Sequence, residues 1–422
     1  MNPRYKKSLE KWNESKKHLV SGSVTISKNP ELYTLGAYPI YIKEGKGVSV
    51  KDIDGNKYID FQSGLGAVIL GLSYKRMNDA IKKQTNKGIL FPLSQTLQID
   101  LAKQICTMVP CAERVRFMKN GSDATSAAIR IARAYTKRDK IISCHFHGWH
   151  DWFYVITPQN RGIPSSLKED IFEFKYNDID SLKKIFEKNK GQIATVIMEA
   201  AQLEAPNKGF LEEVKKIAHG NGALLIFDEV VTGFRFSKGG AQEYFGVIPD
   251  LCCLAKSLGN GLPISAVAGK KEIMENTEDV ITSMTYGEEC LSMVGAIEVL
   301  NEIEEKPIIK HIWELGAAFQ KEYNNLTQKY GINTKCIGFP CRLELSFSDY
   351  KNFKRKEIKA YFLQETAKKG IIFGMHIFMT YSHKKEHIKK ALKVCEEVFK
   401  KIKSLEEIDK LPLEGELPVE LW

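Results

Sequence analysis

The 422-residue sequence lacks any run of about 18 consecutive apolar residues, so it predicts no membrane-spanning helix. It also lacks internal repeats and low-complexity tracts, and its charged N-terminal stretch has no apolar centre, so we expect no secretory signal. Nine cysteines are present without a Cys-x-x-Cys pair, which favours free thiols in a reducing cytoplasm. The hydrophobic fraction of 43% and the charged fraction of 27% are those of an ordinary globular protein.

The formal net charge of +10 has two interpretations: a surface that binds nucleic acids or anionic membranes, or a solvated lysine-rich surface. The lysines are spread along the chain among glutamates, and no basic block is interleaved with aromatic residues. This pattern favours the solvated surface, so we expect no nucleic-acid partner and no membrane partner. The same positive excess would attract phosphorylated small molecules.

Alternating helix and strand patterns begin near residue 76. Helical patterns cover residues 75–86, 97–108 and 124–136, and apolar strand candidates are residues 115–118, 140–143, 193–198 and 224–227. Such alternation predicts an α/β fold with a mainly parallel sheet and helices on both faces. Ligands bind beyond the carboxyl ends of the strands in such sheets, and Glu199 and Asp228 follow two of these strands.

The two ends of the chain predict a smaller α+β domain. Tyr5, Leu9, Trp12 and Leu19 fit one face of an N-terminal helix, and Asp54-Gly55 predicts a tight turn in the hairpin that follows. Near the C-terminus, strand patterns at residues 342–347 and 370–383 flank a helix, and an amphipathic helix covers residues 384–402. We therefore expect an arm and hairpin at residues 1–75, a large domain at 76–310 and a C-terminal small domain at 311–422, the first and last forming one unit.

Two charged residues lie at the ends of apolar runs. Asp228 ends the run of residues 223–227, and Lys256 ends a later run before a Gly-Asn-Gly-Leu-Pro turn. Most lysines are solvated surface charges, so neither residue alone is informative. Together they can bind the two ends of pyridoxal phosphate (PLP), because the amine forms a Schiff base and the carboxylate pairs with the pyridine nitrogen.

Asn120-Gly121-Ser122 precedes a predicted helix. A helix N-terminus offers backbone N–H groups and a positive dipole end, which suits a phosphate. The alternative interpretation is purely structural, with Asp123 as the cap of that helix. Histidines at 145, 147 and 150 have no zinc-type spacing and no paired cysteine, so we expect no metal site.

In combination these motifs resemble class III aminotransferases of PLP fold type I, and within that class the glutamate-1-semialdehyde aminomutase-like branch. The resemblance covers nearly the whole chain, from DIDGNKYIDF through the C-terminal domain, with its motifs in the order of the family. It is carried by KNGSDATSAAIRIARAYTKRDKI, FHGWHDW, LLIFDEVVTGFR and PDLCCLAKSLGNGLPISAVAGK. KNGSDATSAA and TYGEECLS are most similar to members found in bacterial surface-polysaccharide and related secondary pathways. The resemblance implies PLP as cofactor, a seven-stranded mainly parallel sheet between helices, and a cytoplasmic homodimer.

The resemblance also implies a role for each motif residue. The implied cofactor contacts are Asn120, Gly121 and Ser122 at the phosphate, Phe146 and His147 over the ring, Glu199 near its polar groups, Asp228 at the pyridine nitrogen, Val230 on the other ring face, Lys256 as the Schiff-base lysine, and Thr285 at the phosphate of the neighbouring subunit's PLP. Active sites shared in this way would make the homodimer obligatory for activity.

Two further residues are candidate substrate contacts. The loop after Glu199 departs from the family, which has Glu-Pro and then an asparagine, and Gln202 is our candidate donor to the ring hydroxyl or to a substrate. Glu289 has two readings that we weigh equally, a contact for an ammonium group or sugar hydroxyls and an acid at a helix N-terminus.

Several departures distinguish the chain from the aminomutase itself. The aminomutase has Gly-Asn-Pro where this chain has Glu288-Glu289-Cys290, and the gating stretch near the C-terminus is shorter and apolar, with Met375 and His376. We therefore expect an aminotransferase that moves an amino group from a small-molecule donor to an aldehyde or keto acceptor, including a sugar or other surface-polysaccharide precursor. The alternatives are intramolecular amino transfer of the glutamate-1-semialdehyde 2,1-aminomutase type and a non-catalytic PLP-binding protein.

Overall fold

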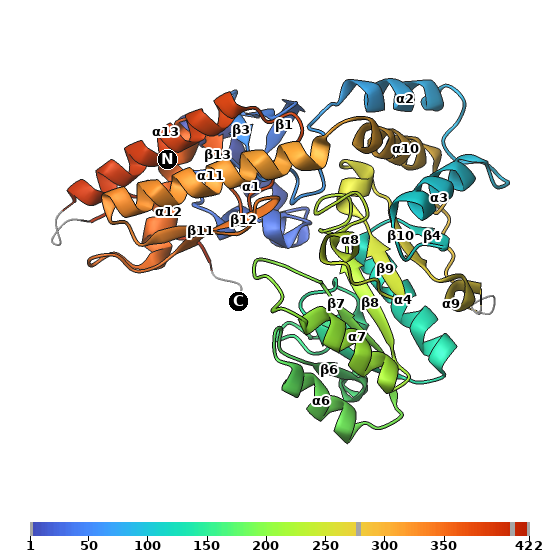
Figure 1. The fold of residues 1–422 in the computed structure, drawn as a ribbon. Helices are drawn as coiled ribbons and strands as arrows, with labels where there is room; N and C mark the ends of the chain where they lie inside the picture. Colours follow the sequence, from blue (N-terminus) through green and yellow to red (C-terminus); the bar gives the residue numbers. More distant parts are fainter. Residues whose placement is uncertain (1–2, 276–279, 406–409, 420–422) are drawn as a thin grey trace. The chain divides into compact units, whose positions relative to one another are not determined.

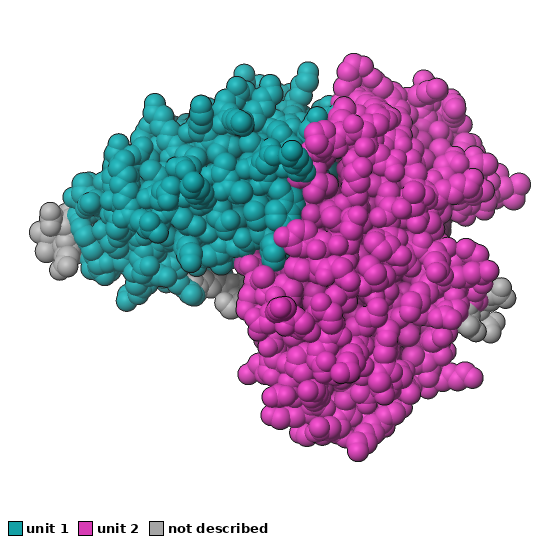
Figure 2. Space-filling view, viewed as in Figure 1, with its two compact units in different colours: residues 1–74, 310–422 teal, residues 75–309 magenta. Residues whose placement is uncertain are grey.

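The computed structural model describes residues 3–275, 280–405 and 410–419. The chain divides into two compact units, one built from residues 1–74 with 310–422 and the other from residues 75–309, coloured separately in Figure 2. The first unit thus contains both chain ends, and the second contains the long α/β segment.

The second unit is built on a seven-stranded sheet (Figure 1). The strand order is β4 (Arg114–Met118), β10 (Ser265–Gly269), β9 (Leu251–Leu254), β8 (Leu224–Glu229), β7 (Ile193–Met198), β5 (Lys140–Cys144) and β6 (Ile171–Glu173). The strands from β9 to β6 are parallel, and β10 runs antiparallel to both of its neighbours. Every residue of β7, β8 and β9 is buried, as expected for parallel strands covered on both faces. The predicted mainly parallel α/β fold is confirmed.

Helices of the second unit connect and cover these strands. They are α2 (Lys75–Thr85), α3 (Leu97–Met108), α4 (Gly121–Thr136), α5 (Asp151–Tyr154), α6 (Ile179–Lys188), α7 (Phe210–Gly220), α8 (Ala241–Phe245), α9 (Lys271–Glu275) and α10 (Cys290–Glu305), with short 3-10 turns η5 (Ser165–Asp170) and η6 (Lys256–Gly259). Ala124, Ala127, Ala128 and Ile131 of α4 are buried in the core that the sheet also lines. Small alanine side chains let this helix approach the sheet closely, which fixes the position of its N-terminus.

The first unit contains two small sheets. One has the order β1 (Ile42–Lys46), β2 (Ser49–Asp52), β3 (Lys57–Asp60) and β13 (Ile371–Ile372), so a strand from the C-terminal part pairs with the N-terminal hairpin. The other is the antiparallel pair β11 (Thr334–Phe339) and β12 (Arg342–Phe347). The helices are α1 (Lys6–Ser15), α11 (Ile308–Tyr330), α12 (Arg355–Lys368) and α13 (Lys385–Ser404), and 3-10 turns lie at Pro3–Tyr5, Val20–Gly22, Ile26–Lys28 and Pro30–Leu32.

Two sequence predictions in this unit were wrong. Residues 370–383 were expected to form a strand, but only Ile371–Ile372 does. The segment is apolar because Ile377, Phe378 and Met379 are buried, and it contributes isolated backbone hydrogen bonds instead of a ladder. Leu19 was expected on the N-terminal helix, but α1 ends at Ser15 and Leu19 is exposed.

No helix in the described ranges combines the length and the apolar composition needed to cross a bilayer.

Candidate active site

Asp228 and Lys256 lie at the same edge of the sheet. Asp228 lies near the end of β8, and the parallel pairing of β8 with β9 sets it opposite Cys253. Lys256 follows β9 by two residues and begins η6. Its backbone φ of 41° is left-handed, a strained conformation for a lysine that structures tend to keep at functional sites. The half-buried amine side chain and the carboxylate therefore come from two adjacent strand ends.

A buried histidine fixes the Asp228 carboxylate. His147 Nδ1 lies 2.8 Å from Asp228 Oδ2, and the Val230 amide donates to Asp228 Oδ1 at 3.0 Å. His147 is 2% exposed and Asp228 4% exposed, so water does not screen the pair. Among the described residues, His147 Nε2 has no hydrogen-bond partner although it is buried. The carboxylate is thus held in one orientation by two donors at the end of β8.

The N-terminus of α4 is built by a capping box. Asn120 Oδ1 accepts from the Asp123 amide at 3.1 Å, and Asp123 Oδ2 accepts from the Asn120 amide at 3.0 Å. The cap is therefore Asn120, and Asp123 is the third residue of the helix that completes the box. The first N–H groups of a helix have no partner within it, so those of Gly121 and Ser122 point out of the helix end and suit an anion.

The loop that carries His147 packs against this helix end. Thr125 Oγ1 donates to the His147 carbonyl at 2.7 Å, and the Trp149 amide donates to Ser122 Oγ at 3.2 Å. Gly148 has φ +107°, and a Cβ there would lie 2.4 Å from Ser122 Oγ. Only glycine therefore allows this close approach between the loop and the helix. The loop thus brings His147 to Asp228 while its backbone is held against Ser122 at the N-terminus of α4.

Phe146 and Val230 lie beside the same cluster. Phe146 is 53% exposed, and its ring meets Phe153 edge-on at 5.5 Å between centroids. Val230 is near the start of α4, because a Cβ on Gly121 would lie 3.0 Å from Val230 Cγ1. Both side chains offer apolar surface next to polar groups that could orient a planar ligand.

Glu199 and Gln202 form a separate polar pair. Glu199 directly follows β7, is 5% exposed and accepts a short hydrogen bond from Gln202 Nε2. The amide nitrogen of Gln202 is thus directed at Glu199. The hydroxyl of Tyr176 donates to the Ala200 carbonyl at 2.7 Å and fixes the backbone after Glu199.

Glu289 is the N-cap of α10. Its carboxylate accepts from the Leu291 amide and from Ser292 Oγ, each at 2.6 Å, and lies 3.3 Å from Lys119 Nζ. Burial raises the pKa of Glu289, but these hydrogen bonds outweigh it and lower the pKa below its ordinary value. The structure thus shows Glu289 as a helix cap, and its role as a substrate contact stays a prediction. Thr285 lies nearby in the chain, in an exposed turn.

Sequence reasoning did not identify Thr125 or Trp152. Trp152 stacks on His147 with centroids 6.2 Å apart and an interplanar angle of 14°. A tryptophan five residues after a histidine carries no pattern that would indicate this contact. Within the described ranges, no group of three or more His, Cys, Asp or Glu side chains is arranged to hold a metal ion.

The donor set fits PLP. Asp228 could pair with a protonated ring nitrogen, Lys256 could bind an aldehyde through its amine, and the amides at the start of α4 could bind a phosphate. The glycines at 121 and 148 allow Val230 and Ser122 to lie close to the backbone, because an added Cβ at either position would meet that neighbour.

Comparison with known proteins agrees with this geometry. The aminotransferase class-III family matches residues 34–399. The 3-aminobutyryl-CoA aminotransferase of Cloacimonas acidaminovorans is 36% identical over 402 residues, which cover 93% of this chain and 96% of that protein. A glutamate-1-semialdehyde 2,1-aminomutase of Methanococcus maripaludis is 35% identical over 367 residues, covering 83% and 84%.

Solved structures share the fold. The PLP internal aldimine form of the FumI protein of Sphingopyxis sp. MTA144 superposes with a TM-score of 0.87 at 25% identity and covers 96% of this chain and 99% of that one. A glutamate-1-semialdehyde aminomutase of Pseudomonas aeruginosa has a TM-score of 0.82 at 16% identity, with 95% and 96% covered.

Proposed function

Because the chain belongs to the class III aminotransferase family, whose members use PLP, we propose that it moves an amino group from a small-molecule amino donor to an aldehyde or keto acceptor. The observation that carries this proposal is the buried His147–Asp228 pair at the same sheet edge as Lys256. A non-catalytic PLP-binding protein would not need a strained lysine next to a fixed buried carboxylate.

Each residue of the cluster has a task in this reaction. PLP, when bound, supplies an electron sink for the bond that breaks at the substrate carbon. Lys256 Nζ would hold the cofactor and, once the substrate amine has displaced it, would act as the base that takes a proton from the substrate carbon. Asp228 keeps the ring nitrogen protonated, and His147 holds the carboxylate in place through Nδ1. Phe146 and Val230 cover the two ring faces, while Glu199 orders the polar groups beside it with Gln202.

The phosphate would be bound at the N-terminus of α4, by Asn120, Gly121 and Ser122, and by Thr285 of a second copy of this chain. The structure supports a homodimer through its exposed apolar residues. Two segments, residues 89–99 and 281–290, meet where the Cys290 amide donates to the Ile89 carbonyl at 2.9 Å. Their exposed large apolar side chains are Ile89, Leu90, Phe91, Leu93, Ile99, Ile281 and Tyr286. Exposed apolar patches of this kind mark protein interfaces. A second copy on this surface would contact the turn that carries Thr285 in a cytoplasmic dimer.

The acceptor is a keto or aldehyde compound of one of two classes. The motif resemblance favours a sugar or other surface-polysaccharide precursor. The relative named for 3-aminobutyryl-CoA makes a β-keto thioester a second class to test. Aminomutase chemistry is the alternative reaction, favoured by relatives that are 34–35% identical and bear that name. It is disfavoured because Glu289, which stands in the aminomutase's Gly-Asn-Pro position, is committed to capping α10.

The first experiment is the visible spectrum of the purified protein before and after addition of amino donors. We expect a band near roughly 410–430 nm, from the lysine-bound conjugated cofactor, that bleaches with one donor such as glutamate. Bleaching that is reversed only by an external keto acceptor supports transamination. Conversion of glutamate-1-semialdehyde to 5-aminolevulinate without a donor would favour the aminomutase instead. A protein that forms no band with added PLP would refute the proposal.

A further inference from the structure

The segment of residues 280–289, which we call the strap, carries Thr285 and contains neither helix nor strand. It leads directly into α10, and Thr285 begins an exposed turn in its second half. A threonine on an exposed turn can contact a ligand of another subunit only if the strap around it is held in a defined position by hydrogen bonds or packing.

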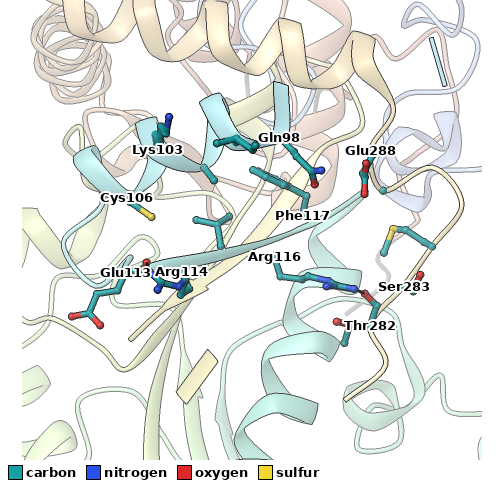
Figure 3. Close-up of a pocket in the computed structure, with 15 residues that line it drawn as sticks. Gln98, Lys103, Cys106, Glu113, Arg114, Arg116, Phe117, Thr282, Ser283 and Glu288 are labelled. Atoms are coloured by element: carbon teal, nitrogen blue, oxygen red, sulfur yellow. Dashed lines mark hydrogen bonds between the residues drawn. The ribbon is translucent and has the colours of Figure 1, made fainter. Parts of the chain in front are cut away.

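Two arginines bind consecutive carbonyls in the first half of the strap. Arg130 Nη1 donates to the Ile281 carbonyl at 2.9 Å. Arg116 donates to the Thr282 carbonyl through both Nε, at 2.9 Å, and Nη2, at 2.5 Å, and Figure 3 shows its side chain directed at Thr282. Hydrogen bonds from a charged donor are stronger than neutral ones, and the planar guanidinium fixes the direction as well as the distance.

The second half of the strap is held from another direction. Ser94 Oγ donates to Glu288 Oε1 at 3.2 Å, and the Cys290 amide donates to the Ile89 carbonyl at 2.9 Å. Thr285 therefore lies between two anchors, with the arginines on one side and the segment of residues 89–95 on the other.

Side-chain packing holds the strap at Met284, which is partly buried against the core of the unit. A cavity of about 600 Å³ lies beside it, lined by strap residues Thr282, Ser283, Met284, Gly287 and Glu288 and by side chains of α3 and β4 (Figure 3). Ile281 is 75% exposed and Thr282 lines this cavity, so packing does little to fix these two residues ahead of Met284. The hydrogen bonds from Arg116, which also lines the cavity, bridge the gap.

The two arginines belong to the elements that build the phosphate end of the active site. Arg116 lies on β4, which leads to Asn120, and Arg130 lies on α4, which begins at Gly121. We propose that Arg116 and Arg130 are positioning residues that hold the strap so that Thr285 meets the cofactor phosphate of the partner subunit. This inference rests on the proposed function, in which Thr285 acts across a homodimer.

The test compares Arg116→Gln with Arg114→Gln. Arg114 lies two residues earlier on the same strand and lines the same cavity, but its guanidinium binds the Glu275 carboxylate and the Glu113 carbonyl, each at 2.9 Å, instead of a strap carbonyl. We expect Arg116→Gln to raise the Kd for PLP about tenfold, in line with one lost charged hydrogen bond, and Arg114→Gln to change it less than about twofold. The Kd is measured by titrating each protein with PLP and recording the visible band, and thermal unfolding without PLP reports on the fold. Equal shifts in the two variants, or none in Arg116→Gln, would overturn the inference.

Heterodimers show in which subunit the arginine acts. In the first heterodimer, one protomer carries both Arg116→Gln and Lys256→Ala and the other is wild type. The wild-type protomer then has the only Lys256, and its site receives the strap of the altered protomer. We expect this site to bind PLP weakly. In the second heterodimer, one protomer carries Arg116→Gln and the other carries Lys256→Ala. The only Lys256 is then in the Arg116→Gln protomer, and its site receives the unaltered strap of the partner. We expect this site to bind PLP with the wild-type Kd. The opposite pattern would overturn the inference while leaving the aminotransferase intact. A wild-type protein without the visible band would refute the proposed function itself, and a monomeric PLP-bound protein would overturn both the dimer and this inference.

Discussion

Replacing Asp228 by asparagine tests the centre of the proposed site. The substitution keeps the size of the side chain and removes its charge, and both Asp228 and His147 are more than nine-tenths buried. Breaking one partner of a buried pair costs on the order of 3–5 kcal/mol. At about 1.36 kcal/mol per tenfold in rate, this cost corresponds to a loss of roughly 10²- to 10⁴-fold in kcat, because the ring nitrogen would no longer be held protonated.

The assay is a single half-reaction with the donor identified by bleaching, at saturating PLP, so that weaker cofactor binding does not mask the chemical step. Glu229→Gln is the matched control. Glu229 is the next residue, is also fully buried, and accepts from the Ala241 and Gln242 amides at 2.8 and 2.9 Å instead of facing the site. We expect Glu229→Gln to lower the thermal unfolding temperature with little change in kcat. Wild-type turnover in Asp228→Asn, or the same loss in both variants, would show that the charge at Asp228 has no special role.

Three further outcomes follow from the structure. Lys256→Ala should bind PLP without the visible band and lose transamination, and any remaining catalytic turnover would argue against the lysine assignment. Gly148→Ala places a Cβ 2.4 Å from Ser122 Oγ and should weaken PLP binding, whereas Gly162→Ala, also at positive φ but with no atom within 4 Å, should leave it unchanged in the same titration. Burial opposes ionisation of Glu365, but hydrogen bonds from two lysines lower its pKa from 4.5 to about 2. The ionised Glu365 therefore stabilises the fold above pH 4.5, and this stabilisation is lost as pH falls toward 2. The difference in the free energy of unfolding between wild type and Glu365→Gln, measured by denaturant unfolding, should shrink across that window. A difference independent of pH would contradict this prediction.

The sequence predicted the central strands well because they are buried on both faces. Residues 193–198 were expected as a strand, and β7 has those bounds. Residues 224–227 were also expected, but β8 continues through two acidic residues because Asp228 and Glu229 still pair with β9. β10 was missed. Its sequence, Ser-Ala-Val-Ala-Gly, has small side chains that give almost no hydrophobic signal, although all five residues are buried.

The candidate site could be predicted only in part. An acid and a lysine at strand ends are visible in the sequence, and so is a glycine turn before a helix. The order of the strands is not visible, and it is this order that sets Asp228 opposite Cys253 and near Lys256. The contact between His147 and Asp228 joins residues 81 positions apart and depends on a loop that only glycine at 148 allows. Local pattern carries no information about such a pairing.

The pair Asp228-Glu229 shows how one strand end serves two purposes. Successive side chains of a strand point to opposite faces of the sheet. Asp228 therefore meets His147 on one face, while Glu229 receives the amides at the start of α8 on the other. Burial raises the pKa of Glu229, so its four hydrogen-bond donors, from Thr232, Ala241 and Gln242, keep the buried carboxyl satisfied. A shift of one residue in the register of β8 would turn Asp228 away from His147 and Glu229 away from the amides of α8. Stability of the fold and chemistry of the site thus depend on the same register, so Glu229→Gln should report on the fold while Asp228→Asn reports on the chemistry.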